Sequence, residues 1–226
     1  MPEWILEISN EIGYMLFNDV NRVLVLAPHT DDGELGMGGT IHKLLSMGKQ
    51  VIYVAFSTAG KSLPAGMAND TLKVEVKRAT GKLGIEEQNL IIYDYEVREL
   101  NYARQQILET LIALRAQLHP DIVFVPSLHD VHQDHQTIAQ EAVRAFKNTT
   151  LLGYELIWNN LTFNTQCFVE LSEDDLRAKQ EALHEYHSQH GRMYMSDEFV
   201  RSLAVTRGVQ AGVPLAEVFE VIRLFL

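Results

Sequence analysis

The sequence has one cysteine, no long apolar run and few basic residues, and each shortage excludes a class of protein. Cys167 has no partner for an internal disulfide. No stretch approaches the roughly 18–20 consecutive apolar residues that a membrane-spanning helix needs. Met1–Asn10 has neither the basic start nor the apolar run of a signal peptide. We therefore expect a cytoplasmic protein without integral membrane association.

The charge balance is acidic. Lysine and arginine number 19 against 30 aspartate and glutamate residues, which gives a formal net charge of -11 at pH 7. Such a chain, with no basic run, is not expected to bind nucleic acid. The 46% hydrophobic and 22% charged residues exclude a disordered or fibrous chain. The expected partner is a small molecule.

Short apolar runs alternate with helix-like segments from Arg22 onward, and this alternation predicts an α/β fold. Four runs are typical of buried parallel strands: 23–27, 51–56, 90–93 and 122–125. Four segments are typical of helices: 38–47, 71–83, 102–118 and 137–146. The pattern favours a Rossmann-like, doubly wound, mostly parallel sheet with strand order 3-2-1-4.

The last third of the chain has a looser pattern. We expect additional strands at 156–158, 167–171 and 218–226, and a helix that begins after Ser172 and runs to about His190. No internal repeat or linker is evident. Residues 1–226 are therefore predicted to form one domain, with a core at about 20–150 and an extension at about 151–226.

Histidine and carboxylate residues concentrate in two places. His29, Asp31 and Asp32 follow the first predicted strand, and the run from His129 to His135 follows the fourth. In the order 3-2-1-4 these strands are neighbours, and ligands bind beyond the carboxyl ends of such strands. Imidazole and carboxylate are ligands that zinc prefers, and a catalytic zinc needs three protein ligands and an open position. We predict a divalent metal site, Zn2+ by preference with Fe2+ as an alternative.

We assign the metal ligands as His29, Asp32 and His135. A tight turn lets His29 and Asp32 converge on one point because they are three residues apart. The neighbouring Asp31 should then point elsewhere.

The remaining residues of the two clusters receive catalytic roles. Asp31 is free to accept a proton from the attacking water. His132 is placed opposite, as a cation or hydrogen-bond donor that stabilises an oxyanion. Asp134 is expected to hold His132 in position. The structural alternatives are that the aspartates cap the following helix and that the second cluster is a solvated loop.

The same residues carry a family resemblance. The run Pro28 to Asp32 followed by Gly36 to Thr40, together with the run His132 to His135, resembles the two signature motifs of the LmbE-like, PIG-L de-N-acetylase family. The resemblance implies a Rossmann-like zinc enzyme that removes acetyl groups from N-acetylglucosaminyl compounds. It implies His29, Asp32 and His135 as metal ligands, Asp31 as general base and His132 as electrostatic partner. It also implies a homo-oligomer, either a trimer or a hexamer.

The sequence departs from the family pattern at three places. Thr30 stands where the first motif usually has proline, so other contacts must hold that turn. Leu72 and Lys73 stand where many members have a substrate-binding arginine, and we expect Arg78 or Arg98 to replace it. Asp130 stands where some members have tyrosine, so no oxyanion role for a tyrosine is carried over.

Four residues are candidates for substrate contact: Arg98, His129, Asp130 and Trp158. The Trp158 ring is suited to form a floor under a sugar, although core packing is an equal alternative. For His129 and Asp130, a surface position is the favoured alternative to substrate contact.

The predicted function is metal-dependent removal of acetyl from an N-acetylated amino sugar. A nucleotide-linked or otherwise activated sugar is preferred, and a glucosaminyl-malate-type thiol precursor is the alternative. A non-heme iron oxygenase uses a similar ligand set, and a structural metal is a further alternative. A nucleotide-binding oxidoreductase fits poorly, because Ile41 stands where the fingerprint that starts at Gly36 needs glycine or alanine.

Overall fold

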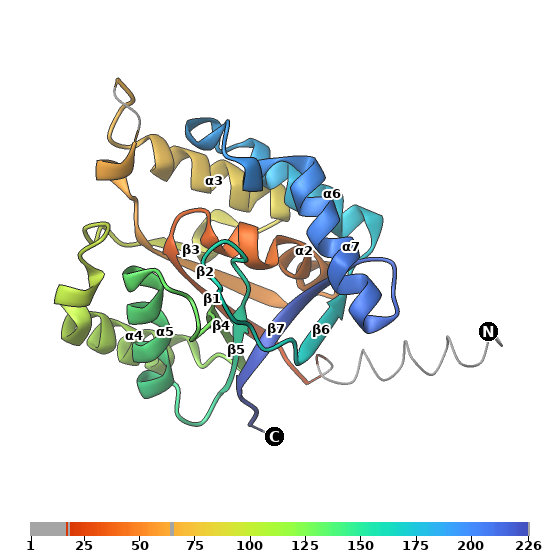
Figure 1. Cartoon of the computed structure of the whole chain (residues 1–226). Coiled ribbons are helices and arrows are strands. Elements are labelled where there is room, and N and C mark those ends of the chain that lie inside the picture. Colours follow the sequence, from red (N-terminus) through yellow and green to blue (C-terminus); the bar gives the residue numbers. More distant parts are fainter. Residues whose placement is uncertain (1–16, 18, 64–65, 226) are drawn as a thin grey trace.

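The computed structural model of the chain describes residues 17, 19–63 and 66–225 and places a seven-stranded sheet between two layers of helices (Figure 1). The strand order is β3-β2-β1-β4-β5-β7-β6, which confirms the predicted 3-2-1-4 core. Met1–Asn10 lies outside the described residues. Within the described ranges, no helix is long and apolar enough to cross a membrane.

Five parallel strands form the core of the sheet, and two antiparallel strands complete one edge. The parallel strands are β1 (Arg22–His29), β2 (Gln50–Ser57), β3 (Leu90–Ile92), β4 (Ile122–Pro126) and β5 (Thr150–Tyr154). The antiparallel strands are β7 (Ala216–Arg223), paired with β5, and β6 (Cys167–Glu170), paired with β7. The last third of the chain thus extends the same sheet.

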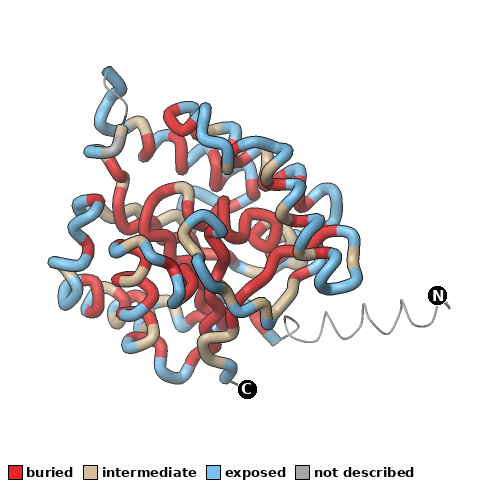
Figure 2. Tube along the Cα trace, in the orientation of Figure 1, coloured by how far each residue is buried: buried red, intermediate tan, exposed pale blue. Residues whose placement is uncertain are grey.

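Helices cover both faces of the sheet. One face carries α2 (Asp32–Ser46), α3 (Thr71–Leu83), α6 (Glu173–His184) and α7 (Asp197–Ala211), and the other carries α4 (Arg104–Leu118) and α5 (Gln133–Ala145). Alternate residues of β1 divide between the two cores: Val23 and Val25 face the first layer, and Leu24 and Leu26 face the second. The buried sheet at the centre of Figure 2 explains why its parallel strands are continuously apolar.

The strand predicted at 156–158 is wrong. The fifth strand is β5, and Leu156 begins a turn instead. Its N–H donates to Asn160 Oδ1 at 2.8 Å, and its carbonyl accepts from the N–H groups of Asn159 and Asn160. These local hydrogen bonds use the backbone groups that a strand would need for its ladder.

The carboxyl-terminal helices differ from the prediction. The Ser172 capping box starts α6 as expected, but the helix ends at His184 rather than near His190. The sequence analysis missed α7, which Ser196 caps. Its buried residues include Val200, Ala204 and Gly208, which give a weak apolar stripe.

Two helices begin earlier than predicted, at the residues of the two polar clusters. Helix α2 begins at Asp32 rather than Gly38, and helix α5 begins at Gln133 rather than Thr137. Both clusters therefore lie at strand-to-helix junctions, and Asp32 and His135 belong to the first turns of helices.

Two glycine substitutions test the packing of the first layer. A Cβ at Gly36 would lie 2.4 Å from Cδ2 of the buried Tyr154 ring, whereas a Cβ at Gly81 in α3 meets nothing within 4 Å. We expect Gly36→Ala to lower the free energy of unfolding by about 1–3 kcal/mol, through overpacking. Gly81→Ala is the control and should leave the free energy of unfolding unchanged or raise it by up to about 1 kcal/mol. Urea denaturation measures both, and equal effects would contradict the packing described here.

Candidate metal centre

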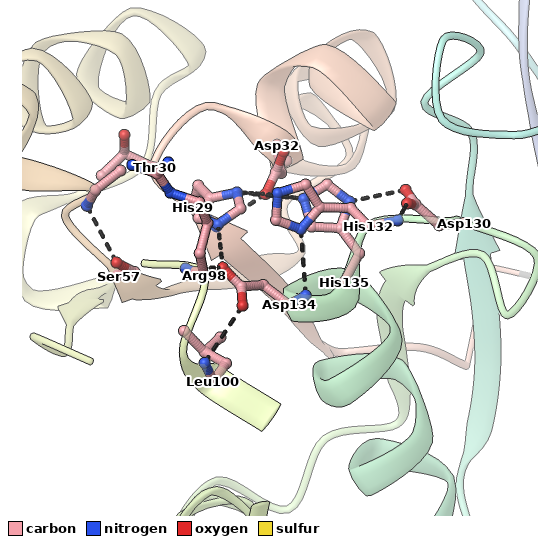
Figure 3. A network of polar contacts seen from close by, with 12 residues as sticks. His29, Thr30, Asp32, Ser57, Arg98, Leu100, Asp130, His132, Asp134 and His135 are labelled. Carbon is pink, nitrogen blue, oxygen red and sulfur yellow. Dashed lines mark hydrogen bonds and ion pairs between the residues drawn. The ribbon is translucent and has the colours of Figure 1, made fainter. Parts of the chain in front are cut away.

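The two polar clusters meet at one edge of the sheet because β1 and β4 are parallel neighbours. His29 is the last residue of β1, and His132 and His135 follow β4 at the start of α5. Figure 3 shows the three imidazoles and Asp32 side by side. Residues about a hundred positions apart in sequence thus share one site.

Three atoms form a nearly equilateral triangle. His29 Nδ1, Asp32 Oδ2 and His135 Nε2 lie 3.2 Å from one another along each edge. A tetrahedral zinc with bonds of about 2.0–2.1 Å requires ligand atoms about 3.3–3.4 Å apart. The predicted ligand set therefore has the spacing that a tetrahedral ion needs.

His132 offers an alternative third ligand. Nitrogen atoms of His29, His132 and His135 all lie within 4.8 Å of one another. This set is looser than the triangle that includes Asp32. We give the tighter set priority because its three distances match a tetrahedral ion without rearrangement.

Asp134 holds His29. Its Oδ2 lies 2.9 Å from His29 Nε2 and accepts the Arg98 N–H at 2.6 Å, while its Oδ1 accepts the Leu100 N–H at 3.3 Å. The imidazole donates from Nε2, which leaves the Nδ1 lone pair directed at the triangle. Asp134 also contacts His132, as predicted, but through its backbone N–H, which donates to His132 Nδ1 at 3.2 Å. Because α5 begins before Asp134, its backbone N–H faces His132 and its carboxylate reaches His29 instead.

Asp130 holds His135 in the same way. Asp130 Oδ2 lies 2.7 Å from His135 Nδ1, so that imidazole presents Nε2 to the triangle. Asp130 Oδ1 also accepts the His132 N–H at 2.8 Å. This buried carboxylate therefore organises the second cluster.

Neighbouring carboxylates favour positive charge at the imidazoles of His29 and His135. Burial lowers the pKa of His29, but Asp32 and Asp134 outweigh it and raise the pKa to about 9. Burial is likewise outweighed at His135, where Asp32 and Asp130 raise the pKa to about 10. Burial raises the pKa of Asp32, but the two histidines outweigh it and hold the pKa well below its usual range. The carboxylates that attract a proton here would also attract a metal cation.

His132 differs from the other two histidines. Burial and the positive charges of His135 and His29 lower its pKa to about 4. Its Nδ1 accepts the Asp134 N–H at 3.2 Å, as the cap of α5. The neutral ring must then carry its proton on Nε2. His132 was predicted to act either as a cation or as a hydrogen-bond donor. The neutral donor fits this geometry, and the cation does not.

Asp31 stands at the N-cap of α2 but makes no capping hydrogen bond with its side chain. The alternative that this carboxylate is a helix cap is therefore wrong. Burial and the neighbouring Asp32 raise its pKa to about 6. Asp31 lies on the cavity wall next to the triangle.

Two tyrosines hold the turn at Thr30, where the family motif usually has proline. The Tyr53 and Tyr186 hydroxyls lie 2.9 Å and 2.7 Å from the Thr30 carbonyl oxygen. Both hydroxyls also contact the carboxyl group of Glu34, whose pKa burial raises to about 8. Gly33 packs directly against the Tyr53 ring, so this glycine serves close packing rather than nucleotide binding.

The triangle opens onto a cavity of about 630 Å3. Seven predicted site residues line it: His29, Asp31, Asp32, Arg98, His132, His135 and Trp158. His129, Asp130 and Asp134 are not among its lining residues. His129 Nε2 lies 3.4 Å from Glu220 Oε1 and within hydrogen-bond distance of Asn164, so its predicted substrate contact lacks support.

The sequence analysis missed one wall of the cavity. Gln189, Arg192 and Tyr194 line it, from the segment between α6 and α7. The buried carboxylate of Glu75 on α3 anchors this segment by accepting the Ser188 N–H at 2.8 Å and the Ser188 hydroxyl at 2.6 Å. The contact joins residues 113 positions apart in the sequence, so no local pattern pointed to it.

Comparison with known proteins agrees with this geometry. The family model described as GlcNAc-PI de-N-acetylase (PIG-L) matches residues 24–146, a range that includes both polar clusters. The chain belongs to the PIG-L family. Its membership confirms the resemblance inferred from the two motifs, and it supports an amide-hydrolysing enzyme.

Individual relatives extend the similarity over most of the chain. The chain is 26% identical to a diacetylchitobiose deacetylase of Thermococcus kodakarensis, over 89% of this chain and 83% of that one. It is 28% identical to an uncharacterised deacetylase of Escherichia coli, over 76% of this chain and 93% of the relative. A crystal structure of a conserved protein from Thermus thermophilus superposes with a TM-score of 0.77 at 26% identity, over 90% and 95% of the two chains.

The contact between Asp134 and His29 predicts an effect on metal affinity. We expect Asp134→Asn to weaken zinc binding by about 10- to 100-fold, because His29 loses the carboxylate that orients it. Competition with a chromogenic chelator measures the affinity. Asp174→Asn, a change at an exposed carboxylate of α6, is the control and should leave zinc binding unchanged. Equal zinc affinity in the Asp134 variant and the unaltered protein would contradict the role of Asp134.

Proposed function

We propose that the chain is a zinc-dependent deacetylase that hydrolyses the acetamide of an N-acetylated amino sugar. The triangle of His29 Nδ1, Asp32 Oδ2 and His135 Nε2 is the observation that carries the proposal. The two deacetylase relatives and the family membership support the reaction class.

The donor set supports zinc as the metal. Two imidazole nitrogens and one carboxylate oxygen are ligands of catalytic zinc sites, which keep a further position open. The same set also binds iron(II) in oxygenases. The deacetylase relatives and Asp31, which has no capping role and lines the cavity, favour hydrolysis. A zinc ion bound there would lower the pKa of water and polarise the amide carbonyl.

The residues of the chain divide the proton chemistry. Asp31 accepts the proton of the attacking water, because its carboxylate lines the cavity and has no capping role. His132 donates from Nε2 to the carbonyl oxygen as negative charge develops there, because its Nδ1 is occupied by the Asp134 N–H. The C–N bond then breaks as the amine takes the proton that Asp31 accepted from the water, and the products are acetate and the free amino sugar.

The cavity has the size expected for a sugar conjugate. Its volume of about 630 Å3 lies within the range of about 300–1,000 Å3 that ligand pockets show. A nucleotide-linked or otherwise activated amino sugar is the preferred substrate, and a glucosaminyl-malate-type conjugate is the alternative. Trp158 lies on the wall, where its exposed edge is available to a sugar. The cytoplasmic location, the single domain and the trimer or hexamer stay predictions.

Metal removal and substitution of the adjacent residues Asp31 and Asp32 test the proposal together. We expect about one zinc per chain, and chelation should abolish acetate release from N-acetylglucosamine conjugates until zinc is restored. Asp31→Asn should lower turnover by at least about 100-fold and leave the zinc content intact. Asp32→Asn should lose zinc. Elemental analysis and an acetate assay measure these effects.

The opposite pattern would contradict the assignment. If Asp31→Asn loses the metal and Asp32→Asn retains it, the two carboxylates are reversed. Oxygen consumption with an iron-loaded protein and a 2-oxoacid, without acetate release, would identify an oxygenase instead.

A further inference from the structure

The rim of the cavity carries positive charge, although the chain as a whole has a net charge of -11. Lys61, Arg98 and Arg192 line the cavity, and the acidic residues on its wall are Asp31 and Asp32 at the metal site. Lys61 is already paired, with Glu96 at 3.1 Å and Glu99 at 3.5 Å.

Arg192 is the cation that stands out. Among the described residues, no carboxylate lies within 4 Å of its guanidinium group. Its Nη1 donates to the Tyr194 hydroxyl, and its guanidinium carbon lies 5.8 Å from the centre of the Tyr194 ring. The protein therefore positions this side chain without neutralising it.

Stacked aromatic rings hold Tyr194, the residue that Arg192 contacts. Trp158 and Tyr194 stack with ring centres 4.0 Å apart and planes 11° apart. This stack joins the turn after β5 to the segment between α6 and α7, which Glu75 also anchors. The guanidinium is therefore held at the cavity before any ligand arrives, which reduces the entropy lost on binding.

Arg192 faces the same cavity as the reaction site. Both Arg192 and Asp31 line it. A group bound to Arg192 would therefore share this cavity with the acetamide that Asp31 serves. The cavity volume of about 630 Å3 leaves room beyond one sugar ring for such a group.

We propose that the group attached to the amino sugar carries negative charge, as a phosphate or a carboxylate, and that Arg192 binds it. This inference rests on the proposed function and adds the class of substrate. A planar guanidinium binds either anion through two parallel hydrogen bonds. A neutral disaccharide, of the kind named for the Thermococcus relative, would offer Arg192 no negatively charged partner.

Binding of the deacetylated conjugates tests the proposal without turnover. Calorimetry on the zinc-loaded protein would compare glucosamine 1-phosphate, the carboxymethyl glycoside of glucosamine and the neutral methyl glycoside. We expect one or both anions to bind at least about 10-fold more tightly than the methyl glycoside. The stronger of the two anions identifies the source of the charge.

Variants of two arginines supply the decisive comparison. Arg192→Gln should remove the preference for the anion, by about 10- to 100-fold, and leave binding of the methyl glycoside unchanged. Arg192→Lys should retain part of the preference. Arg177→Gln is the matched control, because Arg177 is exposed on α6 and does not line the cavity, and it should have no effect.

The outcomes separate this inference from the proposed function. Equal binding of the charged and neutral compounds, no binding of any of them, or a preference that survives in Arg192→Gln would overturn the inference. Acetate release from the N-acetylated forms is measured separately. Release from neutral and charged compounds alike would leave the deacetylase standing while the anion specificity fails.

Discussion

The parallel pairing of β1 with β4 is the constraint on which the site depends. It places the ends of two distant strands side by side. β1 leads into α2 through Thr30 and Asp31, and β4 leads into α5 through the loop at 127–132. His29 and Asp32 come from the first junction, and His132 and His135 come from the second. The sheet order thus brings the metal-binding residues of the two junctions together.

Buried carboxylates convert this placement into a defined set of ligand atoms. Asp134 occupies Nε2 of His29, and Asp130 occupies Nδ1 of His135, so each ring presents its other nitrogen. Backbone N–H groups in turn hold Asp134, including that of Arg98, whose φ of 68° is unusual for a residue other than glycine. The strain at Arg98 accompanies a contact that keeps His29 oriented.

The sequence predicted the parts of the fold that follow from regular patterns. Continuous apolar runs located β1, β2, β3 and β4, and their alternation with helices indicated the strand order. The pattern failed where local hydrogen bonds decide the structure, as in the turn that begins at Leu156. It also failed for α7, whose buried face uses small residues.

The candidate site was predictable in composition and less so in its supporting contacts. Both clusters stood out because histidine and aspartate rarely gather at two strand ends without a role. The partner of Asp134 was not predictable, because it depends on the residue at which α5 begins. Arg192 and Tyr194 escaped notice because a contact between Glu75 and Ser188, more than a hundred residues apart, brings their segment to the cavity.

Anomalous diffraction at the zinc edge, from crystals of the zinc-loaded protein, tests the central claim most directly. The account predicts one ion bound to His29 Nδ1, Asp32 Oδ2 and His135 Nε2, at about 2.0–2.2 Å from each atom. An ion held by His29, His132 and His135 without Asp32, or an ion located away from these residues, would contradict it.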